Sequence, residues 1–366
     1  MRLLLTGGTG TVGVELLRLL IERGTTTEAR VVIRASTPDE LARRWAQLVD
    51  VASAGTMTPT DCPQLRAAAG DLTEPGLGLA PDDAAWVRDL ATHVLHAAAD
   101  IDFNATRERV RPVNVEGTRH ALDVAGSARR LEAFGHLSTL YVAGRRTGLV
   151  LEDELEHDAG FVNPYEESKA EAEWLVREAM AELPASIYRL SLLVGRQSDG
   201  YVHRYMEAHK MFELYASGRV QRIVGHPSHT LDMLPSDYAA GILARLFFDH
   251  FTAGRTYQIS AGDVAPSAAD IVQVFRTHLA RPDWNVGWVS ADEWRDRDAD
   301  GTPLDGVSAA AEWMFDVVGE YLLRPKCFSR AATDAALAVP LPPPPVMDYL
   351  PRILARAAAE DWGRRR

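Results

Sequence analysis

The chain has 366 residues, and 39 basic against 51 acidic side chains give it a formal net charge of −12. That charge argues against a nucleic-acid partner, because such partners are bound by neutralising phosphates with lysine and arginine. The two cysteines exclude a disulfide framework and predict a reducing, cytoplasmic location. No apolar run approaches the ~18 residues that a membrane-spanning helix needs. The length suits one large domain or two small ones.

Short apolar runs alternate with helical patterns through the first two thirds of the chain. Strands are predicted at Leu3–Thr6, Ala29–Arg34, Ala67–Asp71, Thr92–Ala97, Ala133–Leu140 and Ser186–Val194. Helices are predicted at Gly13–Arg23, Pro38–Val51, Val113–Ala125 and Pro164–Glu182. Alternation of this kind implies an α/β fold with a mainly parallel sheet that is covered on both faces.

The alternation stops after Gly195. Residues 196–230 show no clear period, and the Asp- and Arg-rich stretch 290–308 is expected to be exposed. The remaining predictions are strands at Leu231–Leu234 and Thr256–Ser260, a helix at Ala268–Leu279, and an extended connector at Pro340–Pro345 before a final helix.

A glycine-rich segment, TGGTGTVG, lies between the first predicted strand and the first predicted helix. Gly8, Gly10 and Gly13 satisfy the G-x-G-x-x-G pattern of a dinucleotide-binding turn. Glycines allow a tight turn and close approach of the backbone to a pyrophosphate, whose charge the helix N-terminus favours. The segment therefore predicts a Rossmann-type cofactor site formed by Thr6, Gly7, Gly8, Thr9, Gly10, Thr11, Val12 and Gly13.

The end of the second strand distinguishes NADP(H) from NAD(H). An NAD site usually has an acidic residue there to bind the ribose 2′-hydroxyl. Here the strand ends at Arg34, and the nearest downstream acid is Asp39. A guanidinium suits a 2′-phosphate, so the sequence predicts NADP(H). We also expect the ends of the third and fourth strands to contact the cofactor, through Asp71, Leu72, Ala97, Ala98 and Ala99.

Tyr165 and Lys169 begin the long helix with the spacing Y-x-x-x-K, which puts both side chains on one helix face. A nearby ammonium stabilises a phenolate, so Tyr165 can donate a proton to a carbonyl oxygen. Thr139 and its neighbour Ser138 end the fifth strand, where open α/β sheets bind ligands. Asn114 begins the preceding helix and could support Lys169 through a water.

The motifs TGGTGTVG, GDL, HAAAD, VNVEGT, HLSTLYVAG, NPYEESKAEAE and SIYRLSLLVG resemble, in order and spacing, the extended short-chain dehydrogenase/reductases over about residues 1–262. The segments VVIRAS, GDLTEPGLGL, HAAADIDFN and LDMLPSDYAAGIL resemble the thioester reductase branch. That branch includes terminal domains of carboxylic acid reductases and the male-sterility-type fatty acyl-CoA reductases.

The resemblance implies a doubly wound parallel sheet with a smaller, mostly C-terminal substrate-binding lobe. Residues 1–195, with returns near 231–262, would bind NADP, and residues 196–230 and 263–366 would form the lobe. The family's catalytic hydroxyl, tyrosine and lysine fall on Thr139, Tyr165 and Lys169, with Asn114 as the supporting asparagine and Ser138 as the rival of Thr139. Arg34 matches the family's 2′-phosphate arginine.

The implied activity is NADPH-dependent reduction of an acyl thioester, on CoA or a carrier protein of secondary metabolism, to an aldehyde or alcohol. Because the chain begins at its first strand, it resembles a stand-alone member. The alternatives are a ketone or aldehyde reductase, a nucleotide-sugar epimerase or dehydratase, and a non-catalytic NADP-binding sensor. Helices 113–125 and 165–182 could pair in a homodimer, although a monomer is equally compatible.

No pattern predicts a metal site. His93 and His96 would point to opposite faces of a strand, and His226 and His229 have no acidic or cysteine partner near them in the sequence. Fold position alone predicts a set of substrate-facing residues, namely Phe103, Asn104, Tyr141, Val142, Tyr201, His203 and Met206.

Overall fold

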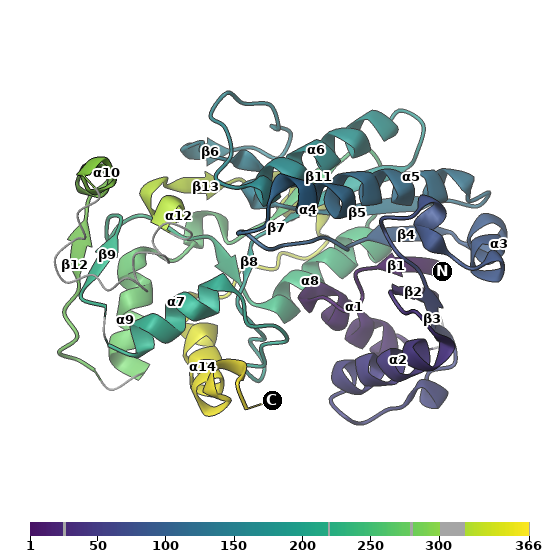
Figure 1. The fold of residues 1–366 in the computed structure, drawn as a ribbon, viewed down its shortest axis with the longest axis horizontal. Helices are drawn as coiled ribbons and strands as arrows, with labels where there is room; N and C mark the ends of the chain where they lie inside the picture. Colours follow the sequence, from purple (N-terminus) through teal and green to yellow (C-terminus); the bar gives the residue numbers. More distant parts are fainter. Residues whose placement is uncertain (25–26, 219, 279–280, 301–318, 366) are drawn as a thin grey trace.

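A computed structural model describes residues 1–24, 27–218, 220–278, 281–300 and 319–365 (Figure 1). Its centre is a seven-stranded parallel sheet with the order β11-β7-β5-β4-β1-β2-β3, which confirms the predicted fold class. The strands are β1 (Arg2–Thr6), β2 (Glu28–Ile33), β3 (Leu65–Ala69), β4 (His93–His96), β5 (Ala133–Thr139), β7 (Ala185–Leu190) and β11 (Thr256–Ile259).

The strands are apolar throughout because both faces of the sheet are covered. In β1, Leu3 and Leu5 pack into the core on one face, and Leu4 packs into the core on the other. Helices α1 (Thr11–Glu22), α2 (Pro38–Ala52) and α8 (Ser236–Ala244) cover the first face. Helices α3 (Pro81–Leu90), α5 (Gly117–Ser127) and α6 (Pro164–Ala179) cover the second (Figure 1).

The strand order reverses between β1 and β4, because β2 and β3 extend the sheet one way and β5, β7 and β11 the other. The carboxyl ends of β1 and β4 therefore frame the crevice where open α/β sheets bind ligands. Both sequence motifs border this crevice, since the glycine loop follows β1 and Thr139 ends β5.

The predicted strand Ser186–Val194 was wrong in its extent. The chain leaves the central sheet after β7 and forms β8 (Leu192–Leu193), which pairs with β10 (Met233–Leu234) in a separate small sheet. Ser191 marks the break, since its hydroxyl donates to Asp232 at 2.5 Å. The predicted helix Val113–Ala125 begins within a wide helical turn at Pro112–Glu116, which follows α4 (Arg107–Arg111), and continues as α5.

Residues 196–230, for which no element was predicted, contain α7 (Glu207–Ala216) and β9 (Arg222–Val224), which pairs with β12 (Gly287–Val289). The stretch 290–308 is not uniformly exposed, because Trp294 in α10 (Ala291–Asp300) is 4% exposed. Residues 301–308 lie outside the described residues. The predicted connector at Pro340–Pro345 contains no helix or strand, and it leads into α14 (Val346–Ala359).

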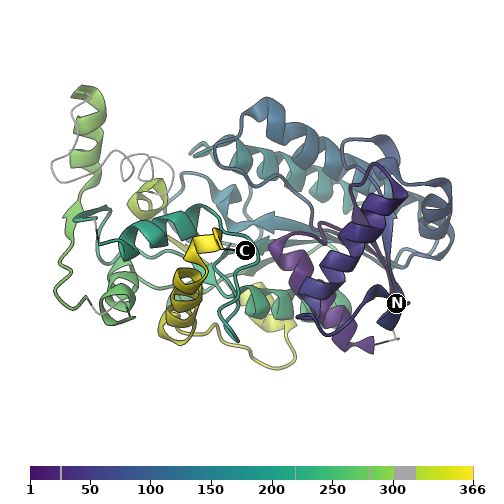
Figure 2. The same ribbon diagram turned by 60° about the horizontal axis from the view of Figure 1, so that its bottom comes forward.

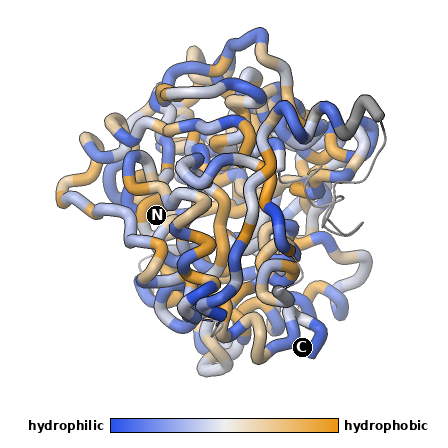
Figure 3. The backbone as a smooth tube through the Cα atoms, turned by 90° about the vertical axis from the view of Figure 1, so that its left-hand side faces the viewer, coloured by the Kyte–Doolittle hydropathy of each residue, from blue (hydrophilic) through white to orange (hydrophobic). Residues whose placement is uncertain are grey.

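A further apolar core is formed by later parts of the chain. Its helices lie beside the central sheet, with the C-terminal helix in yellow (Figure 2). Apolar side chains of α7, α9 (Ala268–His278), α12 (Glu320–Leu323) and α14 form it together with Tyr141 and Val194. A last small sheet pairs β6 (Gly148–Val150) with β13 (Lys326–Phe328). Hydrophobic residues, coloured orange, run through the centre of the molecule, and hydrophilic residues, coloured blue, are frequent at its periphery (Figure 3). None of the described helices has the length and apolar character needed to cross a membrane.

Candidate active site

The glycine loop is packed so tightly that side chains would not fit. A Cβ on Gly7, whose φ is +75°, would lie 2.5 Å from the carbonyl carbon of Ala97, and one on Gly13 would lie 2.2 Å from the carbonyl oxygen of Gly7. The amide of Gly10 donates to the Gly7 carbonyl at 3.0 Å and closes the turn. The loop is therefore pressed against Ala97 and Ala98 after β4, which places the two segments predicted to bind the cofactor side by side.

Helix α1 presents its first amides without competition from the protein. Its N-cap is Gly10, no side chain caps it, and its first turn, which includes Thr11, Val12 and Gly13, contains no acidic residue. Thr6 is different, because its buried hydroxyl contacts His96 Nδ1 at 2.8 Å and accepts from the Ala98 amide at 3.3 Å. Thr6 thus joins β1 to β4, and its side chain is already satisfied within the protein.

Arg34 is exposed directly after β2, and its carbonyl accepts a hydrogen bond from Arg44. Asp71 lies near it after β3, where its carboxylate accepts from the Thr73 amide at 2.9 Å. This bond is the main reason why the pKa of Asp71 is below its ordinary value, and the charge of Arg34 lowers it further. The carbonyl of Leu72 is bonded to His120 at 2.9 Å. Arg34 is therefore an exposed cation at this end of the crevice.

Thr139 and Tyr165 come together as predicted. The Thr139 side chain lies close enough to Tyr165 to lower the pKa of its phenol, and the Tyr141 amide donates to Thr139 Oγ1 at 3.2 Å. Burial raises the pKa of Tyr165 to about 12, against the lowering effect of Thr139. Asn163 caps helix α6 by accepting from the Glu166 amide at 3.0 Å, and so fixes the turn that carries Tyr165.

Lys169 is buried one turn after Tyr165 on helix α6. Its ammonium donates to the Leu137 carbonyl at 2.7 Å and lies 3.2 Å from His136 Nε2. Burial lowers the pKa of Lys169 to about 8, against the opposing effect of Glu173. His136 stacks on His96, and burial holds the pKa of both imidazoles well below the usual range, to about 3 for His96. Two neutral histidines therefore surround the lysine.

Asn114 connects the crevice to helix α6. Its side-chain amide exchanges two hydrogen bonds with the backbone of Asp100, at 2.8 and 2.9 Å, and donates to Ser168 Oγ at 2.8 Å. Ser168 in turn donates to the Tyr165 carbonyl at 2.8 Å. Asn114 thus contacts the residue before Lys169, and its protein contacts position the loop after β4.

Ser138 points away from Thr139 because successive strand residues face opposite sides. Its hydroxyl donates to Glu173 at 2.9 Å, and Arg189 forms a buried ion pair with the same carboxylate at 2.6 Å. Sequence reasoning missed Glu173 and His136, although Glu173 follows Lys169 by four residues and so lies on its helix face. The Ser138 hydroxyl is therefore bound to the buried Glu173–Arg189 pair, and the hydroxyl beside Tyr165 is that of Thr139.

The predicted substrate-facing residues divide into three groups. Phe103 stacks on Tyr165 with ring centroids 5.5 Å apart, and Tyr141 lies 4.5 Å from Tyr321, an aromatic residue that sequence reasoning missed. Near the glycine loop, His203 contacts the Thr9 carbonyl at 3.0 Å and stands beside Tyr201. Outside these two groups are the exposed Asn104, Val142, which packs with Leu155 and Ala170, and Met206, which precedes α7.

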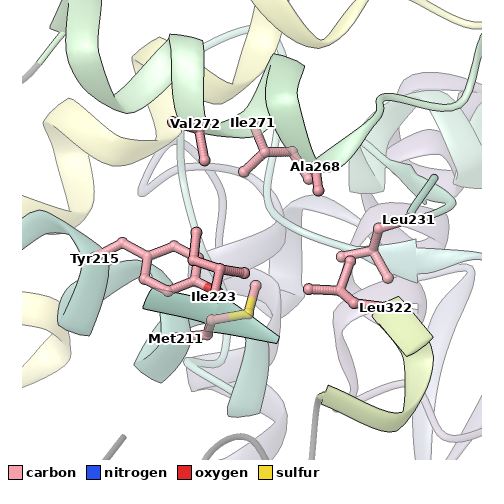
Figure 4. Close-up of a pocket in the computed structure, with 8 residues that line it drawn as sticks. All are labelled: Met211, Tyr215, Ile223, Leu231, Ala268, Ile271, Val272 and Leu322. Carbon is pink, nitrogen blue, oxygen red and sulfur yellow. The ribbon is translucent and has the colours of Figure 1, made fainter. Parts of the chain in front are cut away.

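An apolar cavity lies in the C-terminal core, apart from the glycine loop and Tyr165 (Figure 4). It measures about 10 Å³, far less than the ~300 Å³ of a small ligand site, so it is a packing void. The hydroxyl of Tyr215, one of its lining residues, has no hydrogen-bond partner. Among the described residues, no group of three or more metal-ligating side chains occurs. The cavity is lined by Met211, Tyr215, Ile223, Leu231, Ala268, Ile271, Val272 and Leu322.

Solved structures show the same fold. The terminal R domain from the myxalamid PKS-NRPS biosynthetic pathway superposes with a TM-score of 0.82 at 23% identity, covering 99% of this chain and 91% of that one. A thiolation-reductase di-domain from an archaeal non-ribosomal peptide synthetase gives 0.74 at 20% identity, covering 99% and 76%. A dTDP-glucose 4,6-dehydratase from Bacillus anthracis gives 0.65 at 16% identity, covering 99% and 98%.

Curated relatives are longer proteins. An isonitrile lipopeptide synthase of Streptomyces coeruleorubidus is 34% identical over 210 residues, covering 55% of this chain and 14% of the relative. Fatty acyl-CoA reductase 1 of Xenopus laevis is 24% identical over 266 residues, covering 64% and 52%. The chain thus spans between a seventh and about half of these two relatives. The male sterility protein family matches residues 5–243, well over half of the chain. The chain therefore belongs to this NAD-binding family of extended short-chain dehydrogenase/reductases.

Proposed function

We propose that the chain uses NADPH to reduce an acyl thioester, bound to CoA or to a carrier protein, to an aldehyde or alcohol. The observation that carries the proposal is that Thr139, at the end of β5, lies beside Tyr165, one helical turn before Lys169, at the edge of the sheet where the glycine loop begins α1. Relatives named as fatty acyl-CoA reductases support the thioester as the substrate class.

The residues present fit a dinucleotide. In the glycine loop Gly7, Gly10 and residues 11–12 are partly exposed, and the uncapped N-terminus of α1 offers amides for a pyrophosphate. Arg34, exposed after β2, supports NADPH over NADH, because a guanidinium pairs with a 2′-phosphate. Asp71, Leu72 and Ala97–Ala99 would border the nucleotide. In this proposal residues 1–195, with returns near 231–262, bind the cofactor, and residues 196–230 and 263–366 contact the acyl group.

The chain's own groups would handle the proton. When bound, NADPH would supply the hydride that the carbonyl carbon accepts. Thr139 would donate a hydrogen bond to the carbonyl oxygen and orient it, and Tyr165 would transfer its proton to that oxygen. The product of this step is a hemithioacetal, which breaks its C–S bond to give an aldehyde and a thiol. A second hydride and proton would give the alcohol.

Lys169 would stabilise the phenolate left on Tyr165 and hold the nicotinamide ribose. Its bond to the Leu137 carbonyl and its neutral histidine neighbours leave it as a cation inside a low-dielectric site, where its charge acts strongly. Asn114 would support it by fixing Ser168 and the loop at Asp100. These roles assign catalysis to Thr139, Tyr165, Lys169 and Asn114.

A carrier-bound substrate is supported by the relatives that are peptide synthetases and by the thiolation-reductase di-domain that shares the fold. The same proposal includes a cytoplasmic location, consistent with the two free cysteines, Cys62 and Cys327. It is compatible with a monomer or with a homodimer formed through α5 and α6, where Trp174 is 41% exposed.

The proposal is tested by following NADPH oxidation with panels of acyl-CoAs, aldehydes, ketones and sugar nucleotides. The expected result is oxidation that depends on the thioester, with one thiol released for each aldehyde formed. Oxidation with ketones or aldehydes alone would identify a carbonyl reductase, and turnover of sugar nucleotides would identify an epimerase or dehydratase. Cofactor binding without turnover of any panel would indicate a sensor.

A further inference from the structure

Glu166, the residue after the proposed proton donor, is a fully buried carboxylate. Its Oε2 accepts from the Val162 amide at 2.9 Å, and its Oε1 accepts from the hydroxyl of Tyr321 at 2.7 Å. The same hydroxyl accepts from Asn163 Nδ2 at 3.1 Å. A buried charge is tolerated only where hydrogen bonds replace water, and these bonds do so.

Tyr321 reaches this position from helix α12, 155 residues further along the chain. Its ring lies 4.5 Å from Tyr141 and 6.0 Å from Phe103 between centroids, and Phe103 stacks on Tyr165 at 5.5 Å. Both ends of the Tyr321 side chain therefore act on the surroundings of Tyr165. The hydroxyl holds the helix turn, and the ring completes an aromatic wall.

A simple capping role does not account for this arrangement. Acidic residues in the first turn of a helix are favoured by its dipole, but an exposed side chain is sufficient for that effect. Asn163 already caps α6, and Glu167 supplies a second acid in the same turn. The burial of Glu166 and its bond to Tyr321 need another explanation.

We propose that Glu166 and Tyr321 are positioning residues that fix the first turn of α6 and place a constant negative charge beside Tyr165. The inference rests on the proposed role of Tyr165 as proton donor. The charge opposes loss of the tyrosine proton, whereas the ammonium of Lys169 favours it, so the two groups together set the acidity of Tyr165. Through Tyr321, the C-terminal lobe takes part in setting that property.

Several ionisable groups face Glu166. These are Tyr165 beside it, Tyr141 and Arg145 after β5, Tyr321 on α12 and Lys326 on β13. Burial raises the pKa of Glu166, whereas its bonds to Val162 and Tyr321 and the two cations lower it. Its charge in turn adds to the burial that raises the pKa of Tyr165.

The first test compares Glu166→Gln, which keeps the shape and an acceptor oxygen, with the wild type. Each protein is saturated with oxidised cofactor, and its ultraviolet phenolate absorbance is recorded as a function of pH. The same titration of the matching protein that also carries Tyr165→Phe is subtracted, so that the difference reports the ionisation of Tyr165 alone. We expect Tyr165 to ionise at lower pH in Glu166→Gln. An unchanged or higher ionisation pH would overturn the proposal. Because no turnover is needed, failure of thioester reduction would be seen separately.

The second test uses Tyr321→Phe, which keeps the ring and removes the hydroxyl. We expect kcat to fall about tenfold while the KM for cofactor is unchanged, since the bond to a charged group is lost. The double variant with Glu166→Gln should lose no more than the worse single variant, because the two groups act as one unit. Tyr215→Phe is the matched control, since its buried hydroxyl has no partner, and it should leave kcat unchanged. If the losses of kcat in the two single variants multiplied in the double variant, the proposal that Glu166 and Tyr321 act together would be contradicted.

Discussion

The first 195 residues and the rest of the chain reach the same crevice by different means. The first part reaches it through local motifs, since the glycine loop spans eight consecutive residues and Tyr165 and Lys169 lie one turn apart. The second part reaches it through single long-range contacts, such as His203 with Thr9 and Tyr321 with Glu166. The residues proposed for cofactor binding and catalysis, which need fixed geometry, therefore lie on short continuous segments. The residues that surround them come from segments far apart in the sequence.

The largest effect expected from this contrast is that of Tyr165→Phe. Removing a general acid costs roughly 10²- to 10⁴-fold in rate, so kcat should fall by that factor. Cofactor affinity, measured by fluorescence titration, should change little because the ring remains. Tyr215→Phe removes a hydroxyl of similar burial from the second part and should leave kcat intact. Retained activity in Tyr165→Phe would remove the proton donor from the mechanism.

A comparison of glycines tests how tightly the motif is packed. Gly13→Ala places a Cβ 2.2 Å from a backbone oxygen and should destabilise the fold by roughly 3 kcal/mol, with loss of cofactor binding. Gly241→Ala in α8 meets nothing within 4 Å and should stabilise it by about 0.5–1 kcal/mol. Urea unfolding of both variants measures these changes, and equal stabilities would show that the loop is not closely packed.

The first 195 residues and the rest of the chain each contain one buried lysine, namely Lys169 and Lys326. Burial lowers the pKa of both side chains to about 8. Between about pH 8 and 10.5 the unfolded chain binds a proton at Lys169 that the folded chain does not, so the free energy of unfolding rises with pH there. Relative to Lys169→Met, the wild type should gain roughly 2–3 kcal/mol over that range. Lys326→Met should alter the same profile in the same direction, but only Lys169→Met should weaken cofactor binding.

The smallest effect concerns the choice of cofactor. Arg34→Ala should weaken NADPH binding about tenfold and leave NADH binding unchanged, as expected for loss of one charge-assisted contact to a phosphate. The comparison is Arg364→Ala, an exposed arginine paired with Glu213 near the other end of the chain, which should change neither affinity. Equal affinity of the wild type for NADH and NADPH would contradict the assignment of Arg34.

The sequence was sufficient for the central sheet because each strand is a short apolar run followed by a helical period. It also placed Tyr165 and Lys169 in the first turns of α6, since Asn163 and Pro164 begin this helix at the position that the sequence predicted. The sequence did not predict that the chain leaves the sheet at Ser191. The apolar run continues past this residue, and the hydrogen bond from the serine hydroxyl to the buried Asp232 has no signal in the local sequence.

Other features had no local pattern to reveal them. His136 lies inside an ordinary strand, and its importance comes only from Lys169, which is 33 residues away. Tyr321 follows a segment without a clear period and meets its partners through tertiary packing alone. The different roles of Thr139 and Ser138 likewise depend on which residues contact each hydroxyl. Alternation along a strand predicts that the two side chains face opposite sides of the sheet, but it does not predict which side faces Tyr165.

Helix α14 has a consequence for the order in which the molecule can fold. Its Tyr349 hydroxyl donates to the Met233 carbonyl, and Leu350, Ile353 and Leu354 are buried in the core that also contains Val194. The central sheet is complete once Ile259 has been synthesised, but this second core lacks its closing helix until about a hundred residues later. Contacts this distant in the sequence form slowly. During that interval the newly made sheet would stand beside an open apolar surface, which makes this the stage most exposed to aggregation.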